Sequence, residues 1–113
     1  MKFIKQEQTK EFRNSAICIV EEYPHGDVDI NGSVIEIKGR YPEKGRVVNL
    51  KCKELVYVLV GEGSIAVEQE TFHFSGGDMF IIDAKERYYW QAECKILTVC
   101  TPAFESGQHK IVD

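Results

Sequence analysis

Histidine and cysteine are the side chains most often used for metal binding and nucleophilic catalysis, and this sequence has three histidines and four cysteines. His25, His73 and His109 are far apart in the sequence, in a predicted turn, a predicted strand and the C-terminal tail. The cysteines form no CxxC pair and have no histidine at a zinc-site spacing. They are Cys18, Cys52, Cys94 and Cys100. We therefore expect surface or packing histidines, and reduced thiols buried as small apolar side chains.

Cys52 is the cysteine with the strongest alternative interpretation. Lys51 and Lys53 flank it, and nearby ammonium groups lower the pKa of an exposed thiol. A nucleophilic thiol also needs a base, and no histidine lies nearby in the sequence. A reactive Cys52 is therefore a secondary hypothesis.

The elements that must position these residues are short strands. About nine runs of β-forming residues alternate with turn signals such as 24–26, 42–45, 61–63 and 76–78. The runs are 16–20, 34–38, 46–50, 55–60, 64–68, 71–74, 79–82, 87–91 and 95–101. Run 55–60 is apolar on both faces, which favours a central strand covered on both sides. Only residues 5–12 suggest a helical turn. So many short strands in 113 residues must close or pair face to face, which predicts a barrel or jelly roll.

Two stretches of the sequence resemble the motifs of the cupin superfamily. Glu54 is followed after six residues by Gly61, as in the second half of the first motif. Gly77-Asp78 and the apolar strand after it are similar to the start of the second motif. The resemblance covers about residues 34–101. It implies an all-β, cupin-type double-stranded β-helix (a jelly-roll barrel). Because two cores in 113 residues would each be too small, we expect a single domain over residues 1–113.

The positions that hold metal-binding histidines in cupins are occupied by other residues here. In one alignment the first two fall on Val47 and Asn49, in others on Asn49 and Lys51 or on Val48 and Leu50, and the third falls on Tyr88. Of the metal shell that the resemblance implies, only Glu54 is present. Because amide, phenol and ammonium groups are poor substitutes for imidazole, we expect no cofactor. A divalent transition metal held by Asn49, Cys52, Glu54 and Tyr88 is the alternative.

Five residues are candidates for binding a small molecule in the mouth of such a barrel. If Asn49 and Glu54 keep the inward positions of the family, they project into the cavity, and Tyr88 faces them from the opposite sheet. Trp90 shares a face with Tyr88 and would add an aromatic platform. Arg40 would lie near the mouth and bind a carboxylate or phosphate if its strand face points inward. Alternatively, Glu54 and Arg40 pair with each other and the two aromatic residues are ordinary core.

The function expected from this pattern is binding of a small molecule, with a carbohydrate or carboxylate ligand suggested by analogy alone. The alternative is an enzyme. It would be either a sugar isomerase or epimerase with Glu54 as base and Tyr88 as acid, or a metal-dependent cupin with unusual ligands. A third possibility is a dimeric structural or regulatory module. The resemblance implies a homodimer for each of these functions.

Composition narrows the partners and the compartment. The net charge of −4 and the scattered lysines and arginines argue against nucleic acid and against a membrane surface. The N-terminus has no apolar run after its first lysine, and the longest apolar run, 55–60, is too short to span a bilayer. We therefore expect a cytoplasmic protein.

Overall fold

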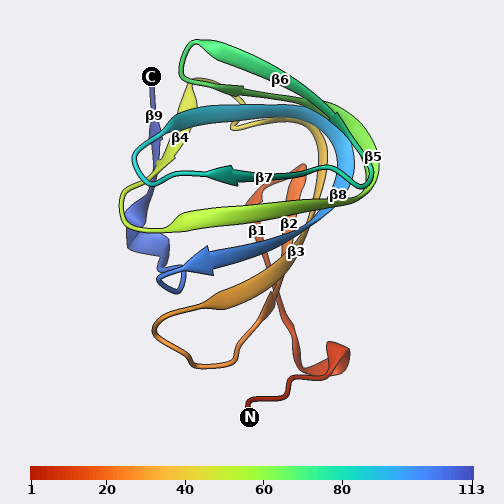
Figure 1. Cartoon of the computed structure of the whole chain (residues 1–113), viewed down its shortest axis with the longest axis vertical. Coiled ribbons are helices and arrows are strands. Elements are labelled where there is room, and N and C mark those ends of the chain that lie inside the picture. Colours follow the sequence, from red (N-terminus) through yellow and green to blue (C-terminus); the bar gives the residue numbers. More distant parts are fainter.

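A computed structural model describes all residues 1–113, which form nine strands of one antiparallel, strongly curled sheet (Figure 1). The elements are η1 (Gln6–Gln8), β1 (Lys10–Ser15), β2 (Cys18–Tyr23), β3 (Asn31–Tyr41), β4 (Arg46–Asn49), β5 (Lys53–Val67), β6 (Glu70–Ser75), β7 (Met79–Ile82), β8 (Arg87–Thr101), η2 (Ser106–Gln108) and β9 (His109–Val112). No helix is long and apolar enough to cross a membrane.

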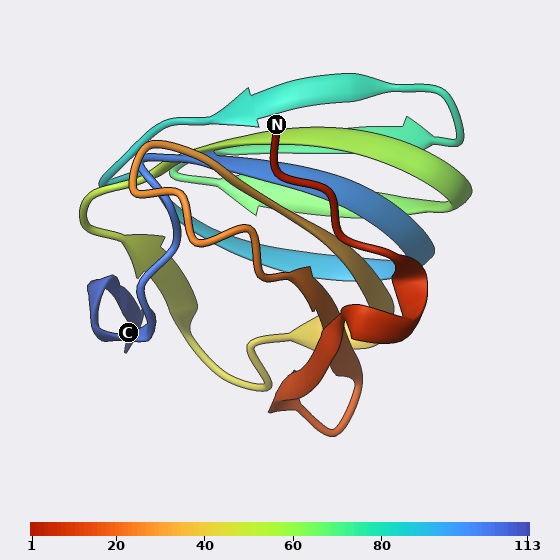
Figure 2. The same ribbon diagram turned by 90° about the horizontal axis from the view of Figure 1, so that it is seen from below.

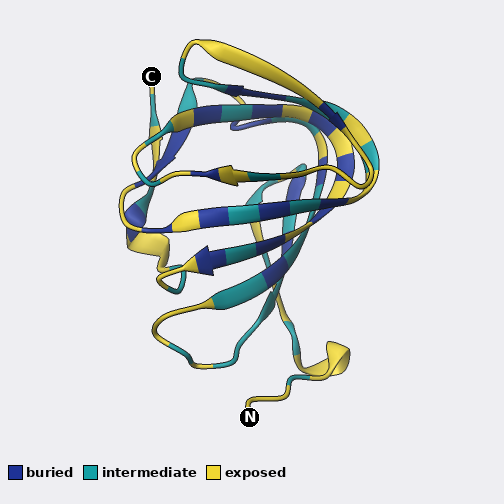
Figure 3. Ribbon diagram, in the orientation of Figure 1, coloured by how far each residue is buried: buried dark blue, intermediate teal, exposed yellow.

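Strand β8 organises the sheet. It pairs with β5 along almost its whole length on one side, and with β3 and then β4 on the other. Its residues alternate between buried and outward-facing positions, so that Tyr88, Trp90 and every second residue up to Cys100 face the interior (Figure 3). The prediction that Tyr88 and Trp90 share a face is therefore confirmed.

The turn expected at residues 61–63 does not exist, because β5 continues through it as one curved strand. Gly61 has a φ of +98°, and a Cβ built there would lie 2.2 Å from the carbonyl oxygen of Glu93. A Cβ at Gly63 would lie 2.3 Å from that of Ala92. These glycines therefore allow β5 and β8 to approach closely where the pair bends, instead of reversing the chain.

The N-terminal segment also differs from the expectation. Only η1 forms the helical turn expected within residues 5–12, and the following residues form β1, which pairs with β2. Figure 2 shows these N-terminal strands below the curved layer of β5 and β8. Of these two strands only β1 was not predicted, since run 16–20 overlaps β2.

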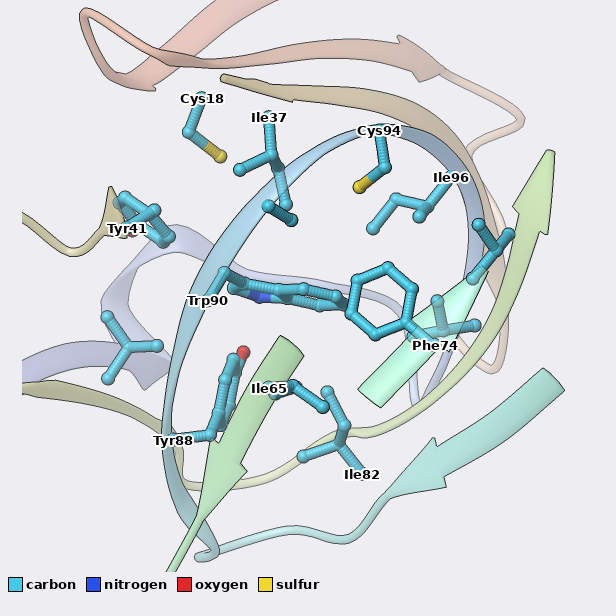
Figure 4. Close-up of a cluster of buried hydrophobic side chains, with 14 residues drawn as sticks. Cys18, Ile37, Tyr41, Ile65, Phe74, Ile82, Tyr88, Trp90, Cys94 and Ile96 are labelled. Carbon is cyan, nitrogen blue, oxygen red and sulfur yellow. The ribbon is translucent and has the colours of Figure 1, made fainter. Parts of the chain in front are cut away.

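The barrel interior at one end is filled by a cluster of 14 buried residues (Figure 4). Phe74 and Trp90 are in edge-to-face contact with ring centroids 5.7 Å apart, and Trp90 also contacts Tyr88. Six of the 14 residues, Trp90 and Tyr88 among them, also line the cavity described below.

The outer surface of the sheet carries apolar side chains on neighbouring strands. In the strand register Leu55 lies opposite Ile81, and Tyr57 lies between Met79 and Leu97. These five residues are called the outer apolar face below. Met79 is 60% and Ile81 is 56% exposed, so the expectation that run 55–60 is covered on both sides is wrong for this chain.

Candidate functional site

A cavity of about 40 Å³ lies inside the curled sheet, lined in part by the buried cluster. Its polar lining includes Glu54 of β5, Tyr88 of β8, Tyr41 of β3 and His109 of β9. The other polar lining residues are Asn14, Glu22, Ser33 and Thr98. Its 17 lining residues include no lysine or arginine, and Glu22 and Glu54 are the only carboxylates among them. The cavity therefore lacks the cationic groups that would bind an anion.

Glu54 is the most unusual group in the cavity. It lies directly opposite Cys100 in the β5–β8 register, and the Cys100 thiol, with Sγ 3.7 Å from Oε1, is its one hydrogen-bond partner. Arg40 does not pair with it. Burial in this weakly polar surrounding raises the pKa of Glu54 from the usual 4.5 to about 7. A carboxyl with such a pKa near neutral pH is typical of catalytic acids and bases.

The Tyr88 hydroxyl accepts a hydrogen bond from a chain of two buried side-chain amides, those of Asn49 and Gln108, called the amide chain below. The backbone N–H groups of Lys51 and Cys52 donate to Oε1 of Gln108. Nε2 of Gln108 donates to Oδ1 of Asn49 at 3.1 Å, and Nδ2 of Asn49 donates to the Tyr88 oxygen at 3.2 Å. Since that oxygen accepts, the hydroxyl hydrogen of Tyr88 remains free. Burial, and then the charge of Glu54, raise the pKa of Tyr88 well above 10, so it stays protonated.

His109 connects the same amide chain to a second phenol. Its Nδ1 lies 2.8 Å from Oδ1 of Asn49, and its Nε2 lies 2.8 Å from the Tyr41 hydroxyl. Burial lowers the pKa of His109, which favours the neutral ring. Because an amide oxygen only accepts, Nδ1 carries the hydrogen, and Nε2 accepts the hydrogen of Tyr41.

Of the five residues predicted to bind a ligand, Glu54, Tyr88 and Trp90 line the cavity and Asn49 lies behind it. Arg40 does not join them, because Tyr41 takes the inward position and Arg40 turns to the outside of β3. Its guanidinium donates to the carbonyl oxygens of Pro42 and Gly45 and stacks 4.0 Å from the Tyr89 ring centroid. The predicted position of Arg40 at the mouth is thus corrected.

Three site residues were not found from the sequence: Tyr41, Gln108 and His109. His109 was expected to be an ordinary surface or packing histidine in the tail, whereas β9 pairs with β4 and sets it directly opposite Asn49. The run Lys110-Ile111-Val112 indicates a strand, but the sequence does not show which strand it pairs with. The C-terminal segment therefore supplies part of the site.

All four cysteines are free and buried, as expected. Lys51 and Lys53 are exposed and lie 3.9 Å from Glu105 and Asp83. The pKa of Cys52 is lowered mainly by a hydrogen bond with the Cys100 thiol, and the same bond raises the pKa of Cys100. The flanking lysines are therefore not what sets the acidity of Cys52, which is 1% exposed.

The donors in the cavity do not fit the metal shell of histidine-containing cupins. No group of three or more histidine, cysteine, aspartate or glutamate side chains is arranged to hold a metal ion. The one imidazole, that of His109, has both ring nitrogens engaged in hydrogen bonds. That the protein works without a metal stays a prediction.

Comparison with solved structures gives the same overall architecture. A structure of a variant of Pac13 from Streptomyces, solved with uridine, has a TM-score of 0.88 at 15% identity and covers 100% of this chain and 92% of its own. Another Pac13 structure is described as a nucleoside dehydratase. Ectoine synthase from P. lautus has a TM-score of 0.74 at 21% identity, with coverage of 100% and 91%. The polyketide cyclase RemF from Streptomyces resistomycificus has a TM-score of 0.74 at 15% identity, with coverage of 100% and 86%.

No protein-family model and no curated protein matches the chain. The structural neighbours are cupin-fold proteins, and the chain has the cupin-type double-stranded β-helix expected from its motifs. Because the neighbours include several small-molecule enzymes, small-molecule chemistry in the barrel is compatible with this fold.

Proposed function

We propose that this protein binds an uncharged, hydrogen-bonding small molecule in the barrel and transfers a proton on it, with Glu54 as the base. The observation that carries this proposal is the Glu54 carboxyl, which borders the cavity with a thiol as its only hydrogen-bond partner. A buried carboxyl that serves only structure is normally bound by several good donors.

Glu54 has the acidity that proton transfer needs. With a pKa of about 7, it is present in both protonation states at neutral pH. It can therefore take a proton from a ligand carbon or hydroxyl and return it at another atom. Returning it to carbon gives isomerisation or epimerisation, and delivering it to a leaving hydroxyl gives elimination of water.

Tyr88 is suited to stabilise the oxygen on which negative charge develops. Its own oxygen accepts from Asn49, so its hydrogen is available to a ligand. Its raised pKa keeps that hydrogen in place beside an ionised Glu54. A fixed donor of this kind stabilises an enolate or alkoxide in a water-poor site.

The residues that line the cavity favour an uncharged ligand over the carboxylate ligand that the sequence analysis also suggested. A carboxylate or phosphate would face Glu22 and Glu54 with no lysine or arginine among the lining residues. A neutral sugar or nucleoside offers a carbonyl or hydroxyl oxygen to the free hydrogen of Tyr88 and a hydroxyl hydrogen to the Tyr41 oxygen, whose own hydrogen goes to His109. The presence of uridine in the Pac13 structures makes a neutral nucleoside the first probe.

Such a ligand requires the cavity to open. A volume of about 40 Å³ holds about three water molecules, whereas drug-sized ligands occupy roughly 300 Å³ or more. Phe12 of β1 and Phe104, both half-buried, belong to the wall and are the side chains whose displacement would enlarge it. We therefore expect these two residues to move on binding.

Two measurements test the proposal. NMR titration should show that uridine, or a neutral pentose, perturbs Tyr88 and Trp90 more strongly than uridine 5′-monophosphate does. In D₂O, the wild-type protein should exchange a carbon-bound hydrogen of a bound ligand, and Glu54→Gln should bind the same ligand without exchange. Tighter binding of the monophosphate would contradict the ligand class. Equal exchange by wild type and Glu54→Gln would contradict the role of Glu54.

A further inference from the structure

We propose that Gln108 is a positioning residue that sets the direction of every hydrogen bond behind the cavity, and with it the tautomer of His109 and the free hydrogen of Tyr88. The part that concerns Tyr88 chemistry rests on the proposed function, whereas the His109 tautomer does not. Gln108 is not part of the cavity wall, so it acts only through Asn49.

The direction originates in the backbone. The N–H groups of Lys51 and Cys52 lie 3.0 and 3.2 Å from Oε1 of Gln108. A backbone N–H can only donate, so this end of the Gln108 amide must be the oxygen. The other end, Nε2, must then donate, and it lies 3.1 Å from Oδ1 of Asn49.

The orientation of the Asn49 amide then fixes the hydrogen bonds of both His109 and Tyr88. Its Oδ1 accepts from Gln108 and from Nδ1 of His109, which leaves Nε2 of His109 to accept from Tyr41. Its Nδ2 donates to Tyr88 and thereby leaves the Tyr88 hydrogen unused. Gln108 and Asn49 are 3% and 1% exposed, so water does not compete for these amides.

The chain can be reversed by one isosteric substitution. In Gln108→Glu, the carboxylate still accepts from Lys51 and Cys52 but has no hydrogen for Asn49. The Asn49 amide is then expected to turn over, so that Nδ2 donates to the introduced carboxylate and faces Nδ1 of His109. His109 must take the Nε2–H tautomer and donate to Tyr41, and Tyr88 must give its hydrogen to Oδ1 of Asn49.

Main-chain hydrogen bonds also hold the backbone on both sides of Gln108. The Leu50 N–H donates to the Gln108 carbonyl oxygen at 2.9 Å, and β9 pairs with β4 from His109 onward. The substitution should therefore leave the C-terminal segment in place. Gln108→Met, of similar length and without polar atoms, is the second variant. It removes the anchor and should give a mixture of both His109 tautomers.

Long-range ¹H–¹⁵N correlation spectra of the imidazole rings read the tautomer directly, without any ligand, and His25 and His73 serve as internal references. The wild-type protein should show His109 as the Nδ1–H form, and Gln108→Glu should show the Nε2–H form as the major one. An Nε2–H form in the wild type, or an unchanged Nδ1–H form in both variants, would overturn the inference.

Hydrogen exchange on a bound ligand then separates this inference from the proposed function. Loss of the free Tyr88 hydrogen should slow exchange about 100-fold in Gln108→Glu, as the loss of one fixed donor commonly does. If the tautomer inverts as expected and the wild type exchanges nothing, the positioning role stands and the proposed proton transfer fails. If the wild type exchanges hydrogen but the His109 tautomer does not invert in Gln108→Glu, the proposed proton transfer stands and the positioning role of Gln108 fails.

Discussion

Replacing Glu54 by glutamine removes a titratable group from the barrel interior while keeping the side-chain volume almost unchanged. A carboxyl with a folded-state pKa above its unfolded value binds its proton more tightly in the folded protein. Its stabilising contribution is therefore complete below about pH 4.5 and is lost as the pH rises through about 7. Glutamine carries no proton to lose, so the free energy of unfolding of the variant should not follow this loss.

The magnitude follows from the two pKa values. The difference between 4.5 and about 7, at 1.36 kcal/mol per pH unit, corresponds to about 3 kcal/mol. Relative to wild type, Glu54→Gln should therefore gain about 3 kcal/mol in free energy of unfolding between pH 4.5 and pH 8. The same substitution should abolish proton transfer, so that stability and activity change in opposite directions.

Urea denaturation followed by circular dichroism at pH 4.5, 6, 7 and 8 gives these free energies for both proteins. Glu93→Gln is the matched control, because it also removes one carboxylate but from an exposed position on the outer side of β8. Subtracting its effect isolates the contribution of burial. A stability difference between Glu54→Gln and wild type that is the same at every pH would refute the raised pKa and with it the role of Glu54.

Three further outcomes are expected. Tyr88→Phe leaves the buried Nδ2 of Asn49 without its acceptor and should lower the free energy of unfolding by about 1–3 kcal/mol, as measured by urea denaturation. The variant should also lose the hydrogen exchange on the ligand described above. Unchanged stability would contradict the amide chain. Alkylation of the native protein with peptide mapping should modify Cys52 no faster than the other three buried cysteines, and selective rapid labelling of Cys52 would contradict its burial. We propose that the outer apolar face mediates a homodimer, so sedimentation at micromolar concentration should show a dimer. Leu97→Asp should dissociate this dimer, whereas the control Lys95→Gln, at an exposed position two residues away, should preserve it. A wild-type monomer would contradict this proposal.

Local signals in the sequence were sufficient for the fold class. β4 and β7 begin and end within one residue of the predicted runs, because compact β-type runs bounded by turn residues have few other structures open to them. Gly61 and Gly63 misled the prediction, since a glycine required for close contact with β8 looks the same in sequence as one required for a turn.

The site was predictable only where it depends on alternation within one strand. Tyr88 and Trp90 lie two residues apart, so one inward position fixes the other. Arg40 was misplaced because the inward face of β3 is set by its register with β8, which local sequence does not reveal. His109 and Gln108 were missed because their positions depend on a long-range pairing between β9 and β4.

Trp90 gives the cavity an optical reporter. It is the only tryptophan in the chain, it lies in the cavity wall, and it touches Phe74 and Tyr88. Indole fluorescence from this protein therefore originates at one place, 3% exposed and a short distance from Glu54. A molecule that enters the barrel should change its emission, and unlabelled compounds can be screened by intensity alone before any reaction is known.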